Sequence, residues 1–115
     1  MPRYVPPFDS KEKHFYRFNY CGPGTNVWRR MREKVQPMDE LDRACFQHDL
    51  VTERRGPFYG KGNPMKMRAA DRKLMHIARR LARADSTYRR KGAAAAVAAG
   101  MEFVLKTGIR GRRLK

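Results

Sequence analysis

The amino-acid sequence predicts an all-α, mainly helical protein, and three stretches of the 115-residue chain carry that prediction. Residues 39–54 and 66–91 each repeat apolar side chains at intervals of three and four, which places these side chains on one helix face. Residues 92–107 are almost all small or apolar and are followed by Gly108, a residue type that often ends a helix. We therefore expect three helices in this order, followed by a basic tail at 108–115.

The segment before these helices divides into three parts. Residues 1–19 contain prolines and aromatic side chains with neither a helical nor an alternating period, so we expect an extended N-terminal arm. Residues 20–26 are expected to form a tight, irregular loop, because two glycines flank Pro23. Residues 27–35 are a basic stretch with one tryptophan.

The first predicted helix begins after Asp39, whose side chain suits the N-cap. Glu40 and Asp42 follow in the first turn, where carboxylates interact favourably with the helix dipole. We expect this helix to end near Thr52 or Arg54. One of its faces carries Leu41, Ala44, Cys45 and His48.

The second predicted helix runs from Lys66 to Lys91 and carries an apolar stripe with arginines elsewhere. Asp71 falls at the edge of this stripe, where a carboxylate normally requires a partner. The stripe consists of Ala70, Leu74, Ile77, Ala78, Leu81 and Tyr88.

The composition favours a polyanionic partner. Lysine and arginine number 27 against 11 aspartates and glutamates, a net charge of +16, which suits nucleic acid, anionic lipid headgroups or acidic proteins alike. No apolar run reaches the roughly 18 residues of a membrane-spanning helix. Residues 1–15 lack the apolar stretch of a signal peptide, so signal-dependent secretion is not expected. Cys21 and Cys45 are too few for a four-thiolate metal site and allow one disulfide at most.

Two adjacent residues, His48 and Asp49, are candidates for chemistry. Neighbouring helical side chains point about 100° apart, so we expect these two to face different partners. We expect His48 to face the second helix, where Asp71 lies at the edge of the apolar stripe, which suggests a dyad whose acid orients a general base. The alternative is a core histidine that only satisfies its hydrogen bonds. Asp49 suits a hard cation such as Ca²⁺, with carbonyls of Gly22-Pro23-Gly24 as further ligands, unless that segment is a plain turn.

Three motifs in this chain resemble phospholipases A2. Tyr20-Cys21-Gly22-Pro23-Gly24 looks like their Y-x-G-x-G calcium loop, and residues 41–49 resemble their D-x-x-C-x-x-H-D active-site helix. Ala69-Ala70-Asp71 resembles the A-A-D of the phospholipase domain in parvovirus minor capsid proteins. Together the motifs cover about residues 19–81, in the same order and with similar spacing.

The resemblance implies a phospholipase A2-like fold in which residues 20–91 form the catalytic core, with two antiparallel active-site helices after a calcium loop. It implies that His48 takes a proton from the water that attacks the sn-2 ester of a glycerophospholipid, while Asp71 orients His48. Calcium and the Gly22 N–H would stabilise the oxyanion. The implied calcium ligands are the carbonyls of Tyr20, Gly22 and Gly24 and the carboxylate of Asp49.

The resemblance also bears on the cysteines. In secreted members of the family, a cysteine of the calcium loop pairs with the one three residues before the catalytic histidine, and Cys21 and Cys45 occupy those positions. A Cys21–Cys45 disulfide is therefore implied, with two reduced, buried thiols as the alternative. The family's tyrosine three residues beyond the His-Asp pair is replaced by Thr52. Either Thr52, Tyr59 or Tyr88 supports Asp71, or Asp71 is less well held.

The residues just after the loop combine an indole with cations, a mixture that suits the interface of an anionic membrane. We expect contact with phospholipid through Trp28, Arg29, Arg30 and Met31. The alternative is a solvated basic stretch with one core tryptophan. The tail at 108–115 could contact nucleic acid instead.

We therefore expect a calcium-dependent phospholipase A2. The A-A-D motif and the missing signal peptide favour a virus-encoded, virion-borne enzyme that breaches an endosomal membrane during entry; a non-viral enzyme would be secreted without a signal peptide. The rival hypotheses are a non-enzymatic basic virion protein that binds nucleic acid and a catalytically weak phospholipase A2 relative.

Overall fold

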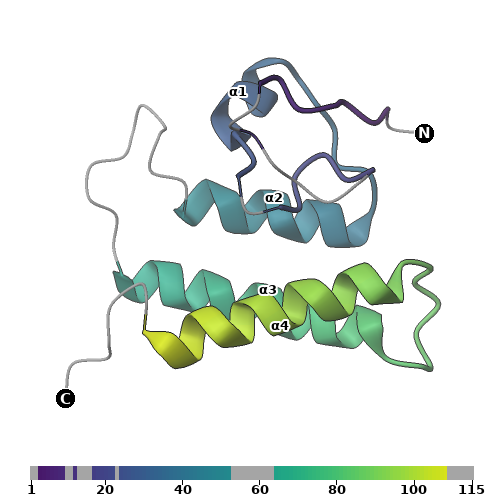
Figure 1. Ribbon diagram of the computed structural model, residues 1–115, viewed down its shortest axis with the longest axis vertical. Coiled ribbons are helices and arrows are strands. Elements are labelled where there is room, and N and C mark those ends of the chain that lie inside the picture. Colours follow the sequence, from purple (N-terminus) through teal and green to yellow (C-terminus); the bar gives the residue numbers. More distant parts are fainter. Residues whose placement is uncertain (1–2, 10–11, 13–16, 23, 53–63, 109–115) are drawn as a thin grey trace. The chain divides into compact units, whose positions relative to one another are not determined.

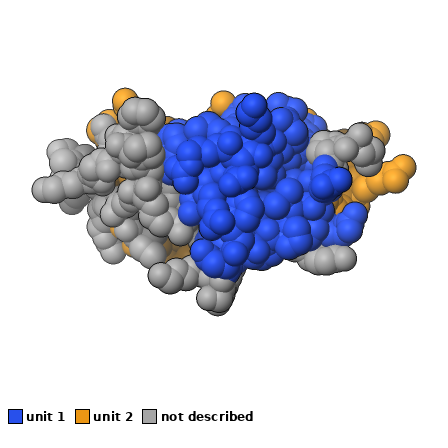
Figure 2. Space-filling model, turned by 90° about the horizontal axis from the view of Figure 1, so that it is seen from above, with its two compact units in different colours: residues 1–61 blue, residues 62–115 orange. Residues whose placement is uncertain are grey.

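The computed structural model describes residues 3–9, 12, 17–22, 24–52 and 64–108. Within these ranges the structure contains four helices and no strand, which confirms the all-α prediction. The chain forms two compact units, residues 1–61 and 62–115, which are coloured separately in Figure 2. The helices are α1 (Val27–Arg32), α2 (Glu40–Thr52), α3 (Pro64–Ala82) and α4 (Lys91–Thr107), labelled in Figure 1.

Unit 1 contains α1 and α2. The short helix α1 lies in the basic stretch, where the sequence did not predict a helix, and it is capped by Asn26, whose Oδ1 accepts the Arg29 N–H at 3.2 Å. The predicted N-cap of α2 is confirmed, because Asp39 Oδ1 accepts the N–H of Asp42 at 3.0 Å. Helix α2 reaches Thr52, one of its two expected ends; Arg54 lies outside the described residues.

The described part of the N-terminal arm is non-helical and belongs to unit 1. Asn19 is fully buried, and its Nδ2 donates to the main-chain oxygens of Arg3 at 2.8 Å and Gln36 at 2.9 Å. Its Oδ1 accepts the Val5 N–H at 2.8 Å. The amide of Asn19 therefore joins the start of the arm to the segment that follows α1.

Unit 2 is a helical hairpin in which α3 and α4 lie side by side and run in opposite directions (Figure 1). The side chains buried on α4 are Ala94, Val97 and Ala98, and their small size allows two helices to approach closely. The buried residues of α3 are Met67, Asp71, Leu74, Met75, Ala78 and Leu81.

Helix α3 ends at Ala82, so the predicted continuation to Lys91 and the placing of Tyr88 on its apolar stripe are wrong. Residues 83–90 turn instead, because Ser86 competes with helical hydrogen bonding. Its N–H donates to Arg83 O at 3.0 Å, and its Oγ accepts the Tyr88 N–H at 3.0 Å.

The third predicted helix is confirmed as α4, which begins one residue earlier than expected. It ends at Gly108, whose φ of 67° lies in the left-handed region that glycine adopts without a steric penalty. The rest of the predicted basic tail lies outside the described residues. Among the helices that the structure describes, none has the length and apolar character needed to cross a membrane.

Candidate active site

The carboxylate of Asp42 holds the start of the predicted calcium loop against α2. Asp42 is fully buried, and its Oδ1 accepts the N–H groups of Tyr20 at 2.7 Å and Cys21 at 3.0 Å. Its Oδ2 accepts the N–H groups of Asn19 at 2.9 Å and Met38 at 2.7 Å. Four main-chain donors thus compensate a buried charge that would otherwise be very costly.

A disulfide ties the same loop to the next turn of α2. Cys21 and Cys45 are bonded, with a Cα–Cα distance of 5.1 Å, so the predicted pairing is confirmed over two reduced thiols. The bridge closes a sequence separation of 24 residues. In the chain-entropy model, a loop of this length stabilises the folded state by roughly 3 to 4 kcal/mol.

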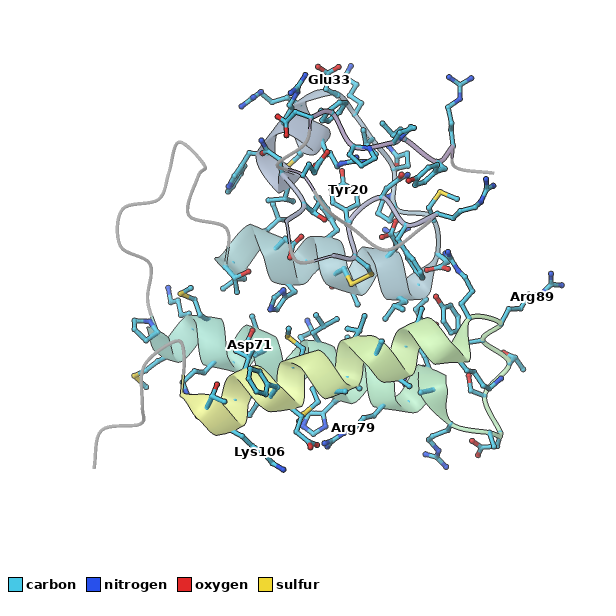
Figure 3. All side chains as sticks on the ribbon, viewed as in Figure 1. Tyr20, Glu33, Asp71, Arg79, Arg89 and Lys106 are labelled. Carbon is cyan, nitrogen blue, oxygen red and sulfur yellow. A yellow bond between two sulfur atoms is a disulfide. The ribbon has the colours of Figure 1, made fainter. Side chains whose placement is uncertain are left out.

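Tyr20, labelled in Figure 3, is a third attachment of the loop. Its hydroxyl donates to Val35 O at 2.7 Å, and its ring lies 4.6 Å from that of Phe46, centroid to centroid. Burial raises the pKa of the Tyr20 phenol to about 12. The side chain therefore stays neutral at physiological pH and has a structural role. The calcium ligand that Tyr20 is predicted to contribute is its main-chain oxygen.

His48 and Asp49 lie together in α2. The Nδ1 atom of His48 is 3.2 Å from Oδ1 of Asp49, a contact between the two neighbours that the sequence did not predict. His48 is buried, with 8% of its surface exposed, and Asp49 is partly buried. The imidazole is thus held beside a carboxylate and largely shielded from solvent, an environment that suits a general base.

His48 belongs to unit 1 and Asp71 to unit 2, so the predicted His48–Asp71 dyad stays a prediction, as does the antiparallel arrangement of α2 and α3. Asp71 is fully buried on α3 (Figure 3). Thr52 donates its hydroxyl hydrogen to His48 O at 3.2 Å, the usual back-bond of a helical threonine. That hydrogen is therefore used within α2. Of the other two candidates for supporting Asp71, Tyr88 lies between α3 and α4 and Tyr59 lies outside the described residues.

The predicted calcium ligands consist of oxygen atoms. Asp49 contributes a carboxylate whose Oδ2 is buried, and Gly22 directly follows the disulfide-bonded Cys21. Among the described residues, no group of three or more His, Cys, Asp and Glu side chains could hold a metal ion. A cation here would therefore rely on main-chain oxygens and one carboxylate, a hard-ligand set that fits Ca²⁺. Gly24 is described, Pro23 lies outside the described residues, and the ligand roles of Tyr20, Gly22 and Gly24 stay predictions.

The prediction that Arg30 contacts the membrane is wrong. Arg30 is fully buried: its Nε donates to Glu12 Oε2 at 2.8 Å and its Nη2 to Glu12 Oε1 at 3.0 Å. Its Nη2 also donates to Pro6 O at 3.0 Å. The buried Glu12 carboxylate draws the guanidinium inward, so Arg30 cannot reach a lipid headgroup.

The other three residues predicted at the membrane differ in exposure. Met31 is 39% exposed, and the side chain of Arg29 is 42% exposed, 4.0 Å from Asp9. Trp28 is partly buried, and its Nε1 is a buried atom. Membrane contact through Trp28, Arg29 and Met31 stays a prediction.

Glu12 is a structural residue that the sequence reasoning missed. Besides Arg30, its carboxylate accepts the N–H groups of Phe8 at 3.0 Å and Asn26 at 2.7 Å. Burial alone would raise the pKa of Glu12, but the hydrogen bonds from Arg30, Phe8 and Asn26 hold it below its ordinary value of 4.5. Glu12 is one of two acids, with Asp9, in an otherwise aperiodic arm, but nothing in the sequence identified its partner.

The family match covers the loop, α2 and α3 together. No curated protein and no solved structure matches the chain. A model of the family described as Phospholipase A2-like domain matches residues 11–88, which is more than half of the chain and includes Cys21, His48 and Asp71. The predicted resemblance to phospholipases A2 is therefore confirmed, and the chain belongs to the Phospholipase A2-like domain family.

Proposed function

We propose that this protein is a calcium-dependent phospholipase A2 that hydrolyses the sn-2 ester of glycerophospholipids. Membership of the family indicates a phospholipase-type function. The observation that carries the finer proposal is the contact between His48 Nδ1 and Asp49 Oδ1 at 3.2 Å. It places a candidate base beside a candidate calcium ligand, on the helix to which the loop is bonded through Cys21 and Cys45.

The chain's own residues would perform the proton transfers. We assign the proton-accepting lone pair to Nδ1, the ring nitrogen on the side of the candidate calcium ligand Asp49, and the hydrogen bond with Asp71 to Nε2–H. This tautomer requires a cation on Asp49, because a free carboxylate at 3.2 Å would instead accept a hydrogen from Nδ1. His48 takes a proton from water as the water oxygen attacks the ester carbonyl carbon. It then returns that proton to the departing lysophospholipid oxygen, which leaves a free fatty acid.

The Tyr20, Gly22 and Gly24 main-chain oxygens and the Asp49 carboxylate would hold calcium. When bound, the ion would polarise the ester carbonyl and offset the negative charge that develops on its oxygen. The Gly22 N–H would add a hydrogen bond to the same oxygen. A site with one carboxylate is expected to bind weakly, with a Kd on the order of 10⁻⁴ to 10⁻³ M.

The net charge of +16 and the exposed Arg29 and Met31 support action at an anionic membrane surface. The likeness of Ala69-Ala70-Asp71 to parvovirus minor capsid proteins supports a virus-encoded enzyme that opens an endosomal membrane during entry. Calcium-dependent leakage of a trapped dye from vesicles with endosomal lipid composition is the expected behaviour. Intact vesicles despite measurable lipid hydrolysis would contradict this role in entry.

The function is tested with phospholipid vesicles whose sn-1 and sn-2 acyl chains carry different labels. We expect release of the sn-2 fatty acid in millimolar calcium and none in excess chelator. Release of the sn-1 chain, or no release in calcium, would contradict the proposal. Binding to DNA that weakens steeply with salt, without lipid turnover, would instead support a basic nucleic-acid-binding protein.

A further inference from the structure

We propose, on the basis of the calcium-dependent phospholipase function proposed above, that Asp42 is a positioning residue that orients the main chain of the calcium loop. Asp42 is the first residue of the D-x-x-C-x-x-H-D segment, in which Asp49 and His48 carry the proposed chemistry. The structure indicates that Asp42 acts through the loop backbone and does not touch the cation.

The loop backbone is fixed by its own N–H groups. Asp42 Oδ1 accepts the Cys21 N–H at 3.0 Å, and that N–H belongs to the same peptide group as the Tyr20 carbonyl. No described peptide bond is cis, and in a planar trans peptide the N–H and C=O point in opposite directions. The Tyr20 carbonyl, a predicted calcium ligand, therefore points away from Asp42. Asp42 thus sets the direction of this carbonyl without contacting it.

The carboxylate has no capacity left for a metal ion. Each of its oxygens accepts two N–H groups, from Tyr20 and Cys21 on Oδ1 and from Asn19 and Met38 on Oδ2. Asp42 is also completely buried. A carboxylate saturated in this way can hold the loop but cannot serve as a ligand.

The spacing along α2 directs the loop towards Asp49. Asp42 and Asp49 are seven residues apart, about two turns, so they lie on nearly the same side of the helix and about 10 Å apart along its axis. Cys45 lies between them and is bonded to Cys21. Successive loop residues are therefore attached to successive turns of α2. Gly22, which is also a predicted calcium ligand, directly follows Cys21 in the chain.

An asparagine at position 42 would break this arrangement with a minimal change in shape. The asparagine amide offers one accepting oxygen in place of two. Its NH₂ group would face the two main-chain N–H groups that the second carboxylate oxygen of Asp42 now accepts. The Cys21–Cys45 disulfide would still hold the loop to α2, so we expect Asp42→Asn to fold with a less ordered loop. Outer residues that orient the ligands of a metal typically change its affinity by about 10- to 100-fold.

The test measures calcium binding by calorimetry and fatty-acid release as a function of calcium, for wild type and Asp42→Asn. We expect Asp42→Asn to raise the calcium Kd and the calcium concentration for half-maximal turnover together, by about 10- to 100-fold. The kcat at saturating calcium should recover to within about threefold of wild type, since His48 and Asp49 are intact. Leu41→Ala, which truncates a fully buried apolar side chain of α2 and leaves its main chain in place, should lower thermal stability without changing the calcium Kd.

An Asp42→Asn variant with wild-type calcium affinity would overturn the positioning role. So would a loss of turnover that saturating calcium does not restore. If Asp42→Asn fails to fold, Asp42→Glu keeps both oxygens but displaces them, and it should show the same shift in Kd to a smaller extent. Failure of both variants to fold while Leu41→Ala folds would also contradict the role, because Asp42 would then serve folding alone. A wild-type protein that neither binds calcium nor releases fatty acid would contradict the proposed function itself.

Discussion

Nδ1 of His48 lies 3.2 Å from Oδ1 of Asp49, although the two residues are neighbours in the sequence of α2. Adjacent helical side chains diverge by about 100°, so this contact depends on side-chain torsion angles that turn the imidazole and the carboxylate towards each other. The pair brings together on one turn of a single helix a group that can move a proton and a group that can bind a cation. Because each residue can be changed alone, substitutions at His48 and at Asp49 test proton transfer and cation binding separately.

Asp49→Asn should abolish measurable calcium binding and lower sn-2 fatty-acid release by about 100-fold or more, a loss typical of removing charge stabilisation from a transition state. Asp49 would supply the one formal negative charge of the proposed ligand set, and an amide is a much poorer ligand for a hard cation. Calorimetry and release from labelled vesicles measure the two effects. Exposed Asp9→Asn is the control and should bind calcium like wild type. Full activity of Asp49→Asn in chelator would exclude a calcium-dependent reaction at this residue.

Glu12→Gln should destabilise unit 1 by about 3 to 5 kcal/mol at neutral pH, because it leaves the charge of Arg30 buried without its ion-pair partner. The folded pKa of Glu12 lies below its ordinary value of 4.5, so its ionised form stabilises the fold. This contribution is complete above pH 4.5 and is lost as the pH falls through the lower folded value. The difference in unfolding free energy between wild type and Glu12→Gln should therefore shrink between neutral pH and about pH 3, as measured by urea denaturation.

Glu33→Gln is the matched control, since Glu33 is exposed at the C-cap of α1 (Figure 3). Its effect should stay within about 0.5 kcal/mol at neutral pH. A pH-independent difference between wild type and Glu12→Gln would contradict the assigned role of the Glu12 carboxylate.

Replacing Cys21 and Cys45 together by serine should lower the free energy of unfolding by roughly 3 to 4 kcal/mol, because the open chain regains loop entropy. Chemical unfolding of the variant and of the oxidised wild type measures this loss. Wild type treated with a reductant should behave like the variant. A loss below about 1 kcal/mol would mean that the bridge constrains the unfolded chain far less than its loop length predicts.

Thr52→Ala should leave kcat within about twofold of wild type and stability within about 0.5 kcal/mol. The Thr52 hydroxyl donates to His48 O of its own helix, a bond that contributes little to stability. Steady-state turnover on phospholipid vesicles measures the first quantity and thermal unfolding the second. A loss of kcat by a factor of ten or more in a folded variant would instead show that Thr52 supports the catalytic groups.

The helices were predictable where local chemistry decides them. The cap at Asp39 and the glycine at 108 mark the start of α2 and the end of α4 through interactions within a few residues. The end of α3 was missed because Arg83, Ala84 and Arg89 are good helix formers, whereas the Ser86 side chain stabilises a turn. Helix α1 was missed because its six residues are too short for a clear period.

The site was predictable where a motif carries it and unpredictable where it depends on tertiary contacts. The spacing of Cys21 and Cys45 relative to His48 identified the disulfide through the family resemblance. Asp42 was predicted only as a favourable charge in the first turn of a helix, because its bonds reach a loop more than 20 residues earlier. Arg30 was misassigned for the same reason, since its partner Glu12 lies 18 residues away in an arm without a periodic pattern.

The most direct test of the central claim is fatty-acid release by His48→Gln at calcium concentrations where calorimetry shows that the variant binds the ion. We expect this variant to bind calcium like wild type. Its rate of sn-2 fatty-acid release should be at least about 100-fold lower than that of wild type, because glutamine cannot accept the proton of water. Turnover by His48→Gln close to the wild-type rate would contradict the assignment of His48 as the base.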